Sequence, residues 1–178
     1  MYLYIDGARM SHALASDSND IQYEDLTSLC DIFILGGTKN GLIGEAIVVV
    51  NEELKKNFIN LIKQKGGLMA KGFVLGIIFD ESFKSKKYFE NAKISYEKAR
   101  ELAKGIKEIG IDFHQDFESN QIFILLDQDK TEKLSENVSF EIFGKDGEMN
   151  IVRLVTTYRT SDDEIKELVK DLGKIYGE

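Results

Sequence analysis

Asp6 and Lys39 are the residues of this sequence whose types and positions best suit chemistry. Asp6 directly follows the apolar run of residues 2–5, and Lys39 stands 33 residues later, just after the apolar run of residues 32–35. If both runs are strands of one α/β sheet, the two side chains lie beyond the carboxyl ends of strands, where ligands bind in such sheets. We therefore expect them to belong to one site.

A lysine amine and a carboxylate at one sheet edge suit an enzyme that uses pyridoxal 5′-phosphate. The amine forms a Schiff base with the cofactor aldehyde, and the acid pairs with the pyridinium nitrogen. Gly36, Gly37 and Gly41 flank Lys39 and let the backbone come close to a cofactor, because glycine has no side chain. The same Gly-Thr-Lys-Asn-Gly stretch also suits an ordinary turn, so the residues alone leave both interpretations open.

The elements that must position these residues lie in the first half of the chain. Continuous apolar runs predict strands over residues 2–5, 32–35 and 46–50, and such runs are typical of strands buried on both faces of a sheet. Apolar spacing predicts helices over residues 8–16, 23–30, 51–67 (with Asn51 as N-cap), 68–83 and 88–109. Residues 1 to about 85 therefore suit part of a doubly wound α/β sheet, and residues 86–110 form a long connecting helix.

The second half has a different pattern, which suits a small α+β domain over residues 111–178. Residues 111–128 predict two strands joined by a turn at 118–120, and residues 139–143 and 150–158 predict two more strands. Helices are predicted over residues 130–138 and 161–177. Ser161 and Glu164 have the spacing of a capping box at the start of the last helix.

The composition argues against several classes of protein. The formal net charge of the 178 residues is −8, which is opposite to the basic surface that binds nucleic acid or anionic membranes. The longest apolar runs are too short to cross a bilayer, and no secretion leader is visible. The single cysteine, Cys30, cannot form an internal disulfide, so a reducing cytoplasm is the expected location.

The histidines and the cysteine carry weaker signals. His12 and His114 have no cysteine or aspartate neighbours at a metal-ligand spacing, so we expect no metal site. We expect His12 to lie on a helix near the site and His114 at the surface of the second domain. Cys30 has helical spacing to Leu26, which favours a packed thiol over a nucleophile.

Three segments together resemble the threonine aldolase branch of the β-eliminating lyase family: YIDGARMSHAL, LCDIFILGGTKNGLIGEAIVVVN and GGLMAKGFVLG. A fourth segment, VRLVTTY, is similar to the Arg-Leu-Val-Thr segment of the family's small domain. The combination of Asp-Gly-Ala-Arg with a later lysine turn is specific. Members of the family are fold-type I pyridoxal phosphate enzymes, so the resemblance implies that residues 1–85 are the C-terminal part of a cofactor-binding large domain.

The resemblance implies roles for five residues. Lys39 would be the catalytic Schiff-base lysine, and Asp6 would pair with the pyridine nitrogen of the cofactor. Arg9 would contact the cofactor or the substrate carboxylate, and Arg153 would hold the α-carboxylate of the substrate. Thr38 would reach the cofactor phosphate. The implied reaction is the cleavage of a β-hydroxy-α-amino acid to glycine and an aldehyde.

The resemblance covers the C-terminal half of such an enzyme, and the chain begins inside a predicted strand. The phosphate-binding turn, the residue that stacks on the cofactor ring and much of the subunit interface would belong to the other half. We therefore expect this chain alone to be a poor catalyst or none, and to associate with the missing half or with a second copy. Another pyridoxal phosphate reaction, β-elimination or transamination, is the enzymatic alternative. A non-catalytic truncated remnant that binds itself or a partner is an alternative from another class.

Overall fold

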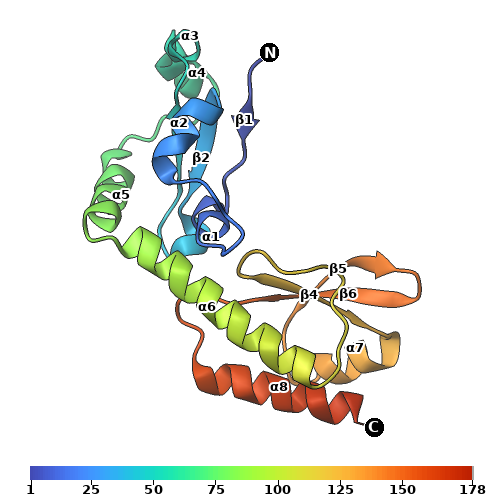
Figure 1. The fold of residues 1–178 in the computed structure, drawn as a ribbon. Helices are drawn as coiled ribbons and strands as arrows, with labels where there is room; N and C mark the ends of the chain where they lie inside the picture. Colours follow the sequence, from blue (N-terminus) through green and yellow to red (C-terminus); the bar gives the residue numbers. More distant parts are fainter. Residues whose placement is uncertain (178) are drawn as a thin grey trace. The chain divides into compact units, whose positions relative to one another are not determined.

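The computed structural model describes residues 1–177 and divides the chain into two compact units. The N-terminal unit is Met1–Asn91, and the C-terminal unit runs from Ala92 onward. Helix α6 (Lys87–Glu108) contributes residues to both units (Figure 1). Each unit has its own sheet and its own cluster of buried apolar side chains.

The N-terminal unit contains the three predicted strands. They are β1 (Tyr4–Ile5), β2 (Ile32–Gly36) and β3 (Glu45–Val49), in the order β1-β2-β3. Strand β1 runs parallel to β2, with Ile5 opposite Phe33, so these two strands end at the same edge of the sheet. Strand β3 runs antiparallel to β2. The turns after β1 and β2 therefore lie at one edge of the sheet.

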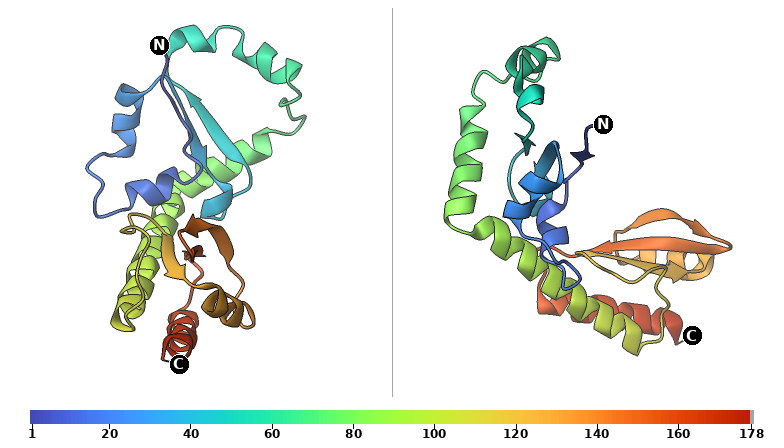
Figure 2. Two further views of the ribbon diagram at one scale, coloured as in Figure 1. Left: turned by 90° about the vertical axis from the view of Figure 1, so that its right-hand side faces the viewer. Right: turned by 45° about the horizontal axis from the view of Figure 1, so that its top comes forward.

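Short helices cover one face of this sheet (Figure 2). They are α1 (Met10–Leu14), the 3₁₀ turn η1 (Tyr23–Asp25) and α2 (Leu26–Leu29). The core on this face has only three buried apolar side chains, from α1, α2 and β2 respectively: Met10, Leu26 and Phe33. Partly buried neighbours such as Leu35 and Val48 surround it.

The opposite face of the sheet carries exposed apolar side chains. Tyr4 is 52% exposed and Ile47 is 53% exposed, although both stand in strands. The prediction that these strands are buried on both faces is therefore wrong for this structure. The physical reason is that α1 and α2 pack on the Phe33 face of the sheet, whereas Tyr4 and Ile47 point to the other face.

The predicted helix over residues 51–67 is two short helices, α3 (Glu52–Lys55) and α4 (Phe58–Gln64). Lys56 has an extended backbone and Asn57 has a left-handed one, with φ of 59°, so the helix cannot continue through them. The Asn51 cap is confirmed, since its side chain accepts a hydrogen bond from the Glu53 amide at 2.9 Å. Helix α5 (Phe73–Lys84) begins five residues later than predicted.

The C-terminal unit is an antiparallel sheet covered on one face by helices α6, α7 (Gln128–Ser135) and α8 (Asp162–Tyr176) (Figures 1 and 2). Its strands are β4 (Gln121–Leu126), β5 (Glu141–Asp146) and β6 (Met149–Val155), in the order β4-β6-β5. The buried apolar side chains of this core come from the sheet, the three helices and one loop: Ala99, Leu102, Ala103, Ile106, Ile111, Ile122, Ile124, Leu126, Leu134, Val152, Leu154, Ile165 and Leu172.

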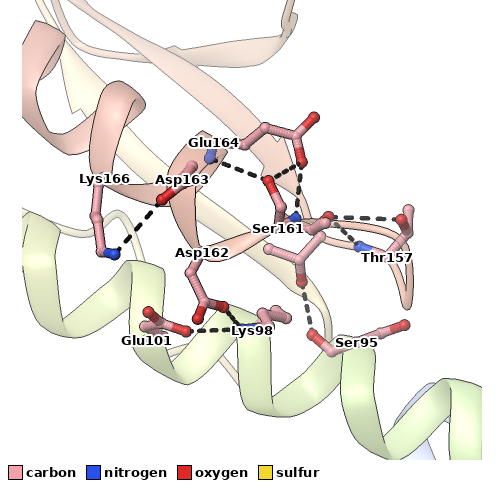
Figure 3. Close-up of polar contacts among 11 residues, drawn as sticks. Ser95, Lys98, Glu101, Thr157, Ser161, Asp162, Asp163, Glu164 and Lys166 are labelled. Carbon is pink, nitrogen blue, oxygen red and sulfur yellow. Dashed lines mark hydrogen bonds and ion pairs between the residues drawn. The ribbon is translucent and has the colours of Figure 1, made fainter.

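Most predictions for this unit are confirmed. Helix α8 begins with the expected capping box, in which Ser161 and Glu164 each bond the other's backbone amide (Figure 3). Beside it, Lys98 of α6 forms an ion pair with Asp162. The prediction of two strands over residues 111–128 is wrong in part, because Phe113 makes only an isolated bridge with Ile124 and a single strand, β4, forms.

Candidate active site

The turns that carry Asp6 and Lys39 meet at the carboxyl edge of the N-terminal sheet. Asp6 directly follows β1, and Lys39 lies in the 3₁₀ turn η2 (Thr38–Asn40), just after β2. The Gly36 amide donates a hydrogen bond to the Gly7 carbonyl at 2.9 Å, which joins the two turns directly. The structure thus brings both residues to one edge, as the sequence predicted.

Two glycines permit this close approach. A Cβ atom on Gly7 would lie 1.9 Å from the Ile34 carbonyl oxygen, and one on Gly36 would lie 2.1 Å from that of Ala8. Neither neighbour is a flexible side chain that could move aside. Any larger residue at either position would push the Asp6 turn away from the Lys39 turn.

Both candidate side chains, Asp6 and Lys39, are exposed. One carboxylate oxygen of Asp6 accepts a hydrogen bond from the Ala8 amide at 3.2 Å, which leaves the second oxygen for a ligand. The amine of Lys39 forms no ion pair with any of residues 1–177. A lysine that no acid neutralises locally keeps its amine for reaction with an aldehyde.

Glu45, at the start of β3, fixes one side of the Lys39 turn. Its carboxylate accepts hydrogen bonds from the amides of Gly37 at 2.6 Å and Thr38 at 3.3 Å, and from the Thr38 hydroxyl at 2.5 Å. The predicted contact of Thr38 with a phosphate would therefore require Glu45 to release that hydroxyl. Sequence reasoning missed Glu45, whose only signal is its position shortly after the turn.

Tyr88 and Asn40 fix the other side of the same turn. The Tyr88 hydroxyl donates to the Gly36 carbonyl at 2.9 Å, and the Asn40 side-chain amide donates to the Tyr88 carbonyl at 2.7 Å. Both side chains are buried. Sequence reasoning missed Tyr88 because the residues that it joins lie about fifty positions apart in the chain.

His12 and Cys30 are two further side chains of the N-terminal unit that the sequence analysis considered for chemistry. His12 is buried on α1, and its burial, with the nearby Arg9 charge, lowers its pKa from 6.5 to about 4. Its ring is therefore neutral at pH 7. The Cys30 thiol donates to the Leu26 carbonyl at 3.3 Å, and burial raises its pKa, which keeps it in the unreactive thiol form.

Arg9 and Arg153 are the two arginines that the sequence assigned to the site. Arg9 stands at the N-cap position of α1, three residues after Asp6. Arg153 lies in β6 of the C-terminal unit, where its guanidinium bonds Glu141 and Gln121 and lies over the Phe143 ring.

A pocket of about 500 Å³ in the C-terminal unit is lined by Arg153 and by a second arginine, Arg159. Thr156, Thr157 and Thr160 also line it. The Nε atom of Arg153 is buried and has no hydrogen-bond partner within the described part of the chain. Guanidinium groups and hydroxyls in one pocket suit a carboxylate, which accepts several hydrogen bonds at once.

Comparison with known proteins identifies the relatives of the chain. The sequence model of the β-eliminating lyase family matches residues 1–129. The chain belongs to this family. Over 99% of its length it is 28% identical to the low specificity L-threonine aldolase of Pseudomonas aeruginosa, of which it spans 51%.

Solved structures give the same relationship. The chain is similar to the threonine aldolase of Leishmania major, with a TM-score of 0.92, 35% identity, and coverage of 99% of this chain and 52% of that one. Serine palmitoyltransferase of Sphingomonas wittichii has the same fold, with a TM-score of 0.69 at 14% identity. The α/β fold of the fold-type I pyridoxal phosphate enzymes is thus confirmed. The chain spans about half the length of these relatives.

The residues at the sheet edge fit part of a pyridoxal phosphate site. Within residues 1–177, the Lys39 amine has no ion pair and one Asp6 carboxylate oxygen has no hydrogen bond, which suits the aldehyde and the pyridine nitrogen of the cofactor. The Gly36–Gly7 hydrogen bond holds the two turns together. The donors of the Thr38 turn are occupied by Glu45, so this edge offers little for the phosphate. No helix of residues 1–177 combines the length and the apolar character that a membrane span requires.

Proposed function

We propose that this chain carries the lysine and the acid of a pyridoxal 5′-phosphate-dependent lyase of the threonine aldolase type. Such an enzyme cleaves a β-hydroxy-α-amino acid to glycine and an aldehyde. One observation carries the proposal: an exposed, unneutralised lysine amine and a carboxylate at one sheet edge, on turns joined through Gly7 and Gly36. The 35% identity with a protein named threonine aldolase supports the choice of reaction.

Each proposed role follows from the chemistry of the side chain. When bound, pyridoxal phosphate accepts the electrons of the bond that breaks at the substrate α-carbon. Lys39 holds the aldehyde carbon through its amine. Asp6 accepts a hydrogen bond from the pyridine nitrogen and keeps that nitrogen protonated. Arg153 binds the α-carboxylate of the substrate, Arg9 binds the same group or the cofactor, and Thr38 donates to the phosphate once Glu45 releases its hydroxyl.

We further propose that catalysis requires polypeptide beyond these 178 residues. The chain spans about half of its relatives, and apolar side chains are exposed on the strands, helices and loops of the N-terminal unit: Tyr2, Leu3, Tyr4, Leu29, Ile43, Ile47, Ile59, Leu61, Leu68, Met69, Phe73, Val74 and Ile77. Such a surface favours association, because its burial removes apolar area from water. The expected partner is the other half of the fold or a second copy of this chain.

The first test is chemical capture of the cofactor. The purified chain is mixed with pyridoxal phosphate and reduced with borohydride, and the adduct is mapped by mass spectrometry. The proposal expects the reduced adduct on Lys39 and its loss in Lys39→Arg, which keeps the charge. Equal labelling of many surface lysines would contradict the assignment.

The second test is turnover of L-threonine and L-allo-threonine, followed by the release of acetaldehyde. The chain alone is expected to be far slower than the usual enzyme range of about 1–1000 s⁻¹. Addition of the other half of the fold is expected to raise the rate. Ordinary turnover by the chain alone would contradict the need for further polypeptide.

β-Elimination is the second candidate reaction, because the family that matches residues 1–129 is named for it. The two reactions give different products from related substrates. Release of pyruvate and ammonia from L-serine would favour elimination, whereas release of glycine and acetaldehyde from L-threonine would favour aldol cleavage.

A further inference from the structure

The turn that carries Lys39 is attached at both ends to the start of helix α6. Before Lys39, the Gly36 carbonyl accepts the Tyr88 hydroxyl at 2.9 Å. After Lys39, the Asn40 side-chain amide donates to the Tyr88 carbonyl at 2.7 Å, and the Asn91 side-chain amide donates to the Asn40 carbonyl at 3.3 Å. Lys39 therefore lies between two fixed points, and Tyr88 is part of both.

Tyr88 is itself held firmly. Its side chain is 0% exposed, and its ring stacks on Phe83 with 4.6 Å between the ring centroids. Edge-on contacts with Phe89 at 5.8 Å and Tyr23 at 6.0 Å fix the ring from other sides. Burial raises the pKa of the phenol to about 12, so its hydroxyl keeps the proton that it donates. A rigid donor of this kind fixes the position of the carbonyl that it bonds.

The hydrogen bond between Tyr88 and Gly36 is also linked to the turn that carries Asp6. Gly36 receives the Tyr88 hydroxyl at its carbonyl and donates its own amide to the Gly7 carbonyl at 2.9 Å. Gly7 directly follows Asp6. Tyr88, Gly36 and Gly7 thus form a chain of hydrogen bonds from α6 to the turn that carries the acid.

Asn40 adds a second fixed point next to the lysine. It is 1% exposed and directly follows Lys39 in η2. On the other side of the turn, the hydrogen bonds of the Glu45 carboxylate within residues 1–177 go to Gly37 and Thr38, so they end at the residue before Lys39. The bonds that Asn40 makes therefore hold the residue directly after Lys39, as Glu45 holds the residue directly before it.

We propose that Tyr88 and Asn40 are positioning residues for Lys39, which hold its turn against α6 so that the amine is presented beside Asp6. The inference rests on the proposed function, in which Lys39 holds the cofactor aldehyde. Neither residue touches the reacting atoms. Each acts through the backbone on either side of the lysine.

The test compares the labelling of Lys39 with that of an internal reference. Wild-type chain and variants are treated with pyridoxal phosphate and borohydride, and mass spectrometry gives the ratio of adduct on Lys39 to adduct on Lys104, an exposed lysine of the C-terminal unit. Tyr88→Phe removes only the hydroxyl donor, and Asn40→Asp replaces the amide donor with an acceptor. Each is expected to lower the ratio about tenfold, which corresponds to the loss of one buried hydrogen bond.

Tyr96→Phe is the matched control, because Tyr96 is a buried tyrosine of the same helix whose ring packs on Phe117 in the C-terminal unit. It is expected to leave the ratio unchanged. If circular dichroism shows that Tyr88→Phe or Asn40→Asp unfolds the N-terminal unit, the variant Tyr88→4-aminophenylalanine tests the positioning role instead. That variant keeps an N–H donor at the same place and is expected to restore a ratio close to that of the wild type.

The outcomes separate the two proposals. A wild-type chain that does not label Lys39 preferentially would overturn the proposed function. Preferential labelling of Lys39 that persists unchanged in folded Tyr88→Phe and Asn40→Asp would overturn the positioning role and leave the proposed function standing. A 4-aminophenylalanine variant that folds but does not recover labelling would also overturn it.

Discussion

The carboxylate of Glu45 accepts a hydrogen bond from the hydroxyl of Thr38, with 2.5 Å between the two oxygens, across the turn that presents Lys39. The same carboxylate caps the amides of Gly37 and Thr38. An acid thus takes the donors that an anionic ligand would otherwise use. This contact stabilises the turn and sets a condition on phosphate binding, because a phosphate at Thr38 must displace the carboxylate.

Glu45→Ala is expected to lower the free energy of unfolding by about 1–3 kcal/mol, because the amide of buried Gly37 loses its acceptor. Urea denaturation measures the change. Glu52→Ala is the matched control, since Glu52 makes an exposed ion pair with Lys55 and should cost at most about 0.5 kcal/mol. Equal effects of the two substitutions would show that Glu45 does not hold the turn.

Thr156→Val is expected to destabilise the C-terminal unit by about 1–2 kcal/mol. The Thr156 hydroxyl donates to the Ser95 carbonyl at 2.7 Å and is buried, and valine keeps the shape of the side chain without the donor. Figure 3 labels Ser95 on helix α6 and draws its hydrogen bond as a dashed line. Thr157→Val, at an exposed neighbour, serves as the control for thermal unfolding. If Thr156→Val and Thr157→Val unfold at the same temperature, the assigned hydrogen bond of Thr156 is contradicted.

Asp6→Asn is expected to weaken the binding of pyridoxal phosphate about tenfold, because an amide cannot keep the pyridine nitrogen protonated as a carboxylate does. Asparagine retains an oxygen that can accept the Ala8 amide, so the turn itself should persist. Titration of the cofactor absorbance gives the affinity, with Asp20→Asn, at an exposed aspartate, as the control. Unchanged affinity in Asp6→Asn would remove Asp6 from the site.

His12 should make stability depend on pH. Its pKa is about 4 in the folded chain and 6.5 in the unfolded chain. Between pH 4 and pH 6.5, the imidazole is therefore protonated in the unfolded chain and neutral in the folded chain. The contribution of neutral His12 to the free energy of unfolding is fully present above pH 6.5. It is lost as the pH falls toward 4, and the loss is at most about 3 kcal/mol. Denaturant unfolding at several pH values should show that the free energy of unfolding changes less steeply with pH in His12→Asn than in the wild type. Equal slopes in wild type and His12→Asn would refute this account.

The elements that could be predicted are those with strong local signals. Helix α6 has a clear apolar stripe, and α8 begins with the Ser161–Glu164 pair, so both were found. The helix predicted over 51–67 failed because Asn57 takes a left-handed backbone, which apolar spacing does not encode. The antiparallel direction of β3 was not predicted, although the short connection from β2 leaves no room for the crossover that a parallel strand needs.

The residues of the candidate site also differ in whether a local sequence signal reveals them. Asp6 and Lys39 could be found because Asp6 directly follows β1 and Lys39 lies three residues after the end of β2, and strand ends are visible in a sequence. Tyr88 could not be found, because its bond to Gly36 joins residues 52 positions apart and depends on how α6 packs. The residues proposed to react were therefore easier to identify than the residues proposed to hold them in place.

Helix α6 belongs to two cores of very different size. Its residues up to Asn91 belong to the N-terminal unit, whose sheet core has three buried apolar side chains. Its later turns belong to the C-terminal unit and contribute to a much larger core. The lifetimes of its backbone amides against exchange with deuterated water should therefore change along the helix, near Ala92, although the helix itself is continuous. We therefore expect the boundary between two cooperative units to fall inside a helix, with the smaller core opening while the larger one stays closed.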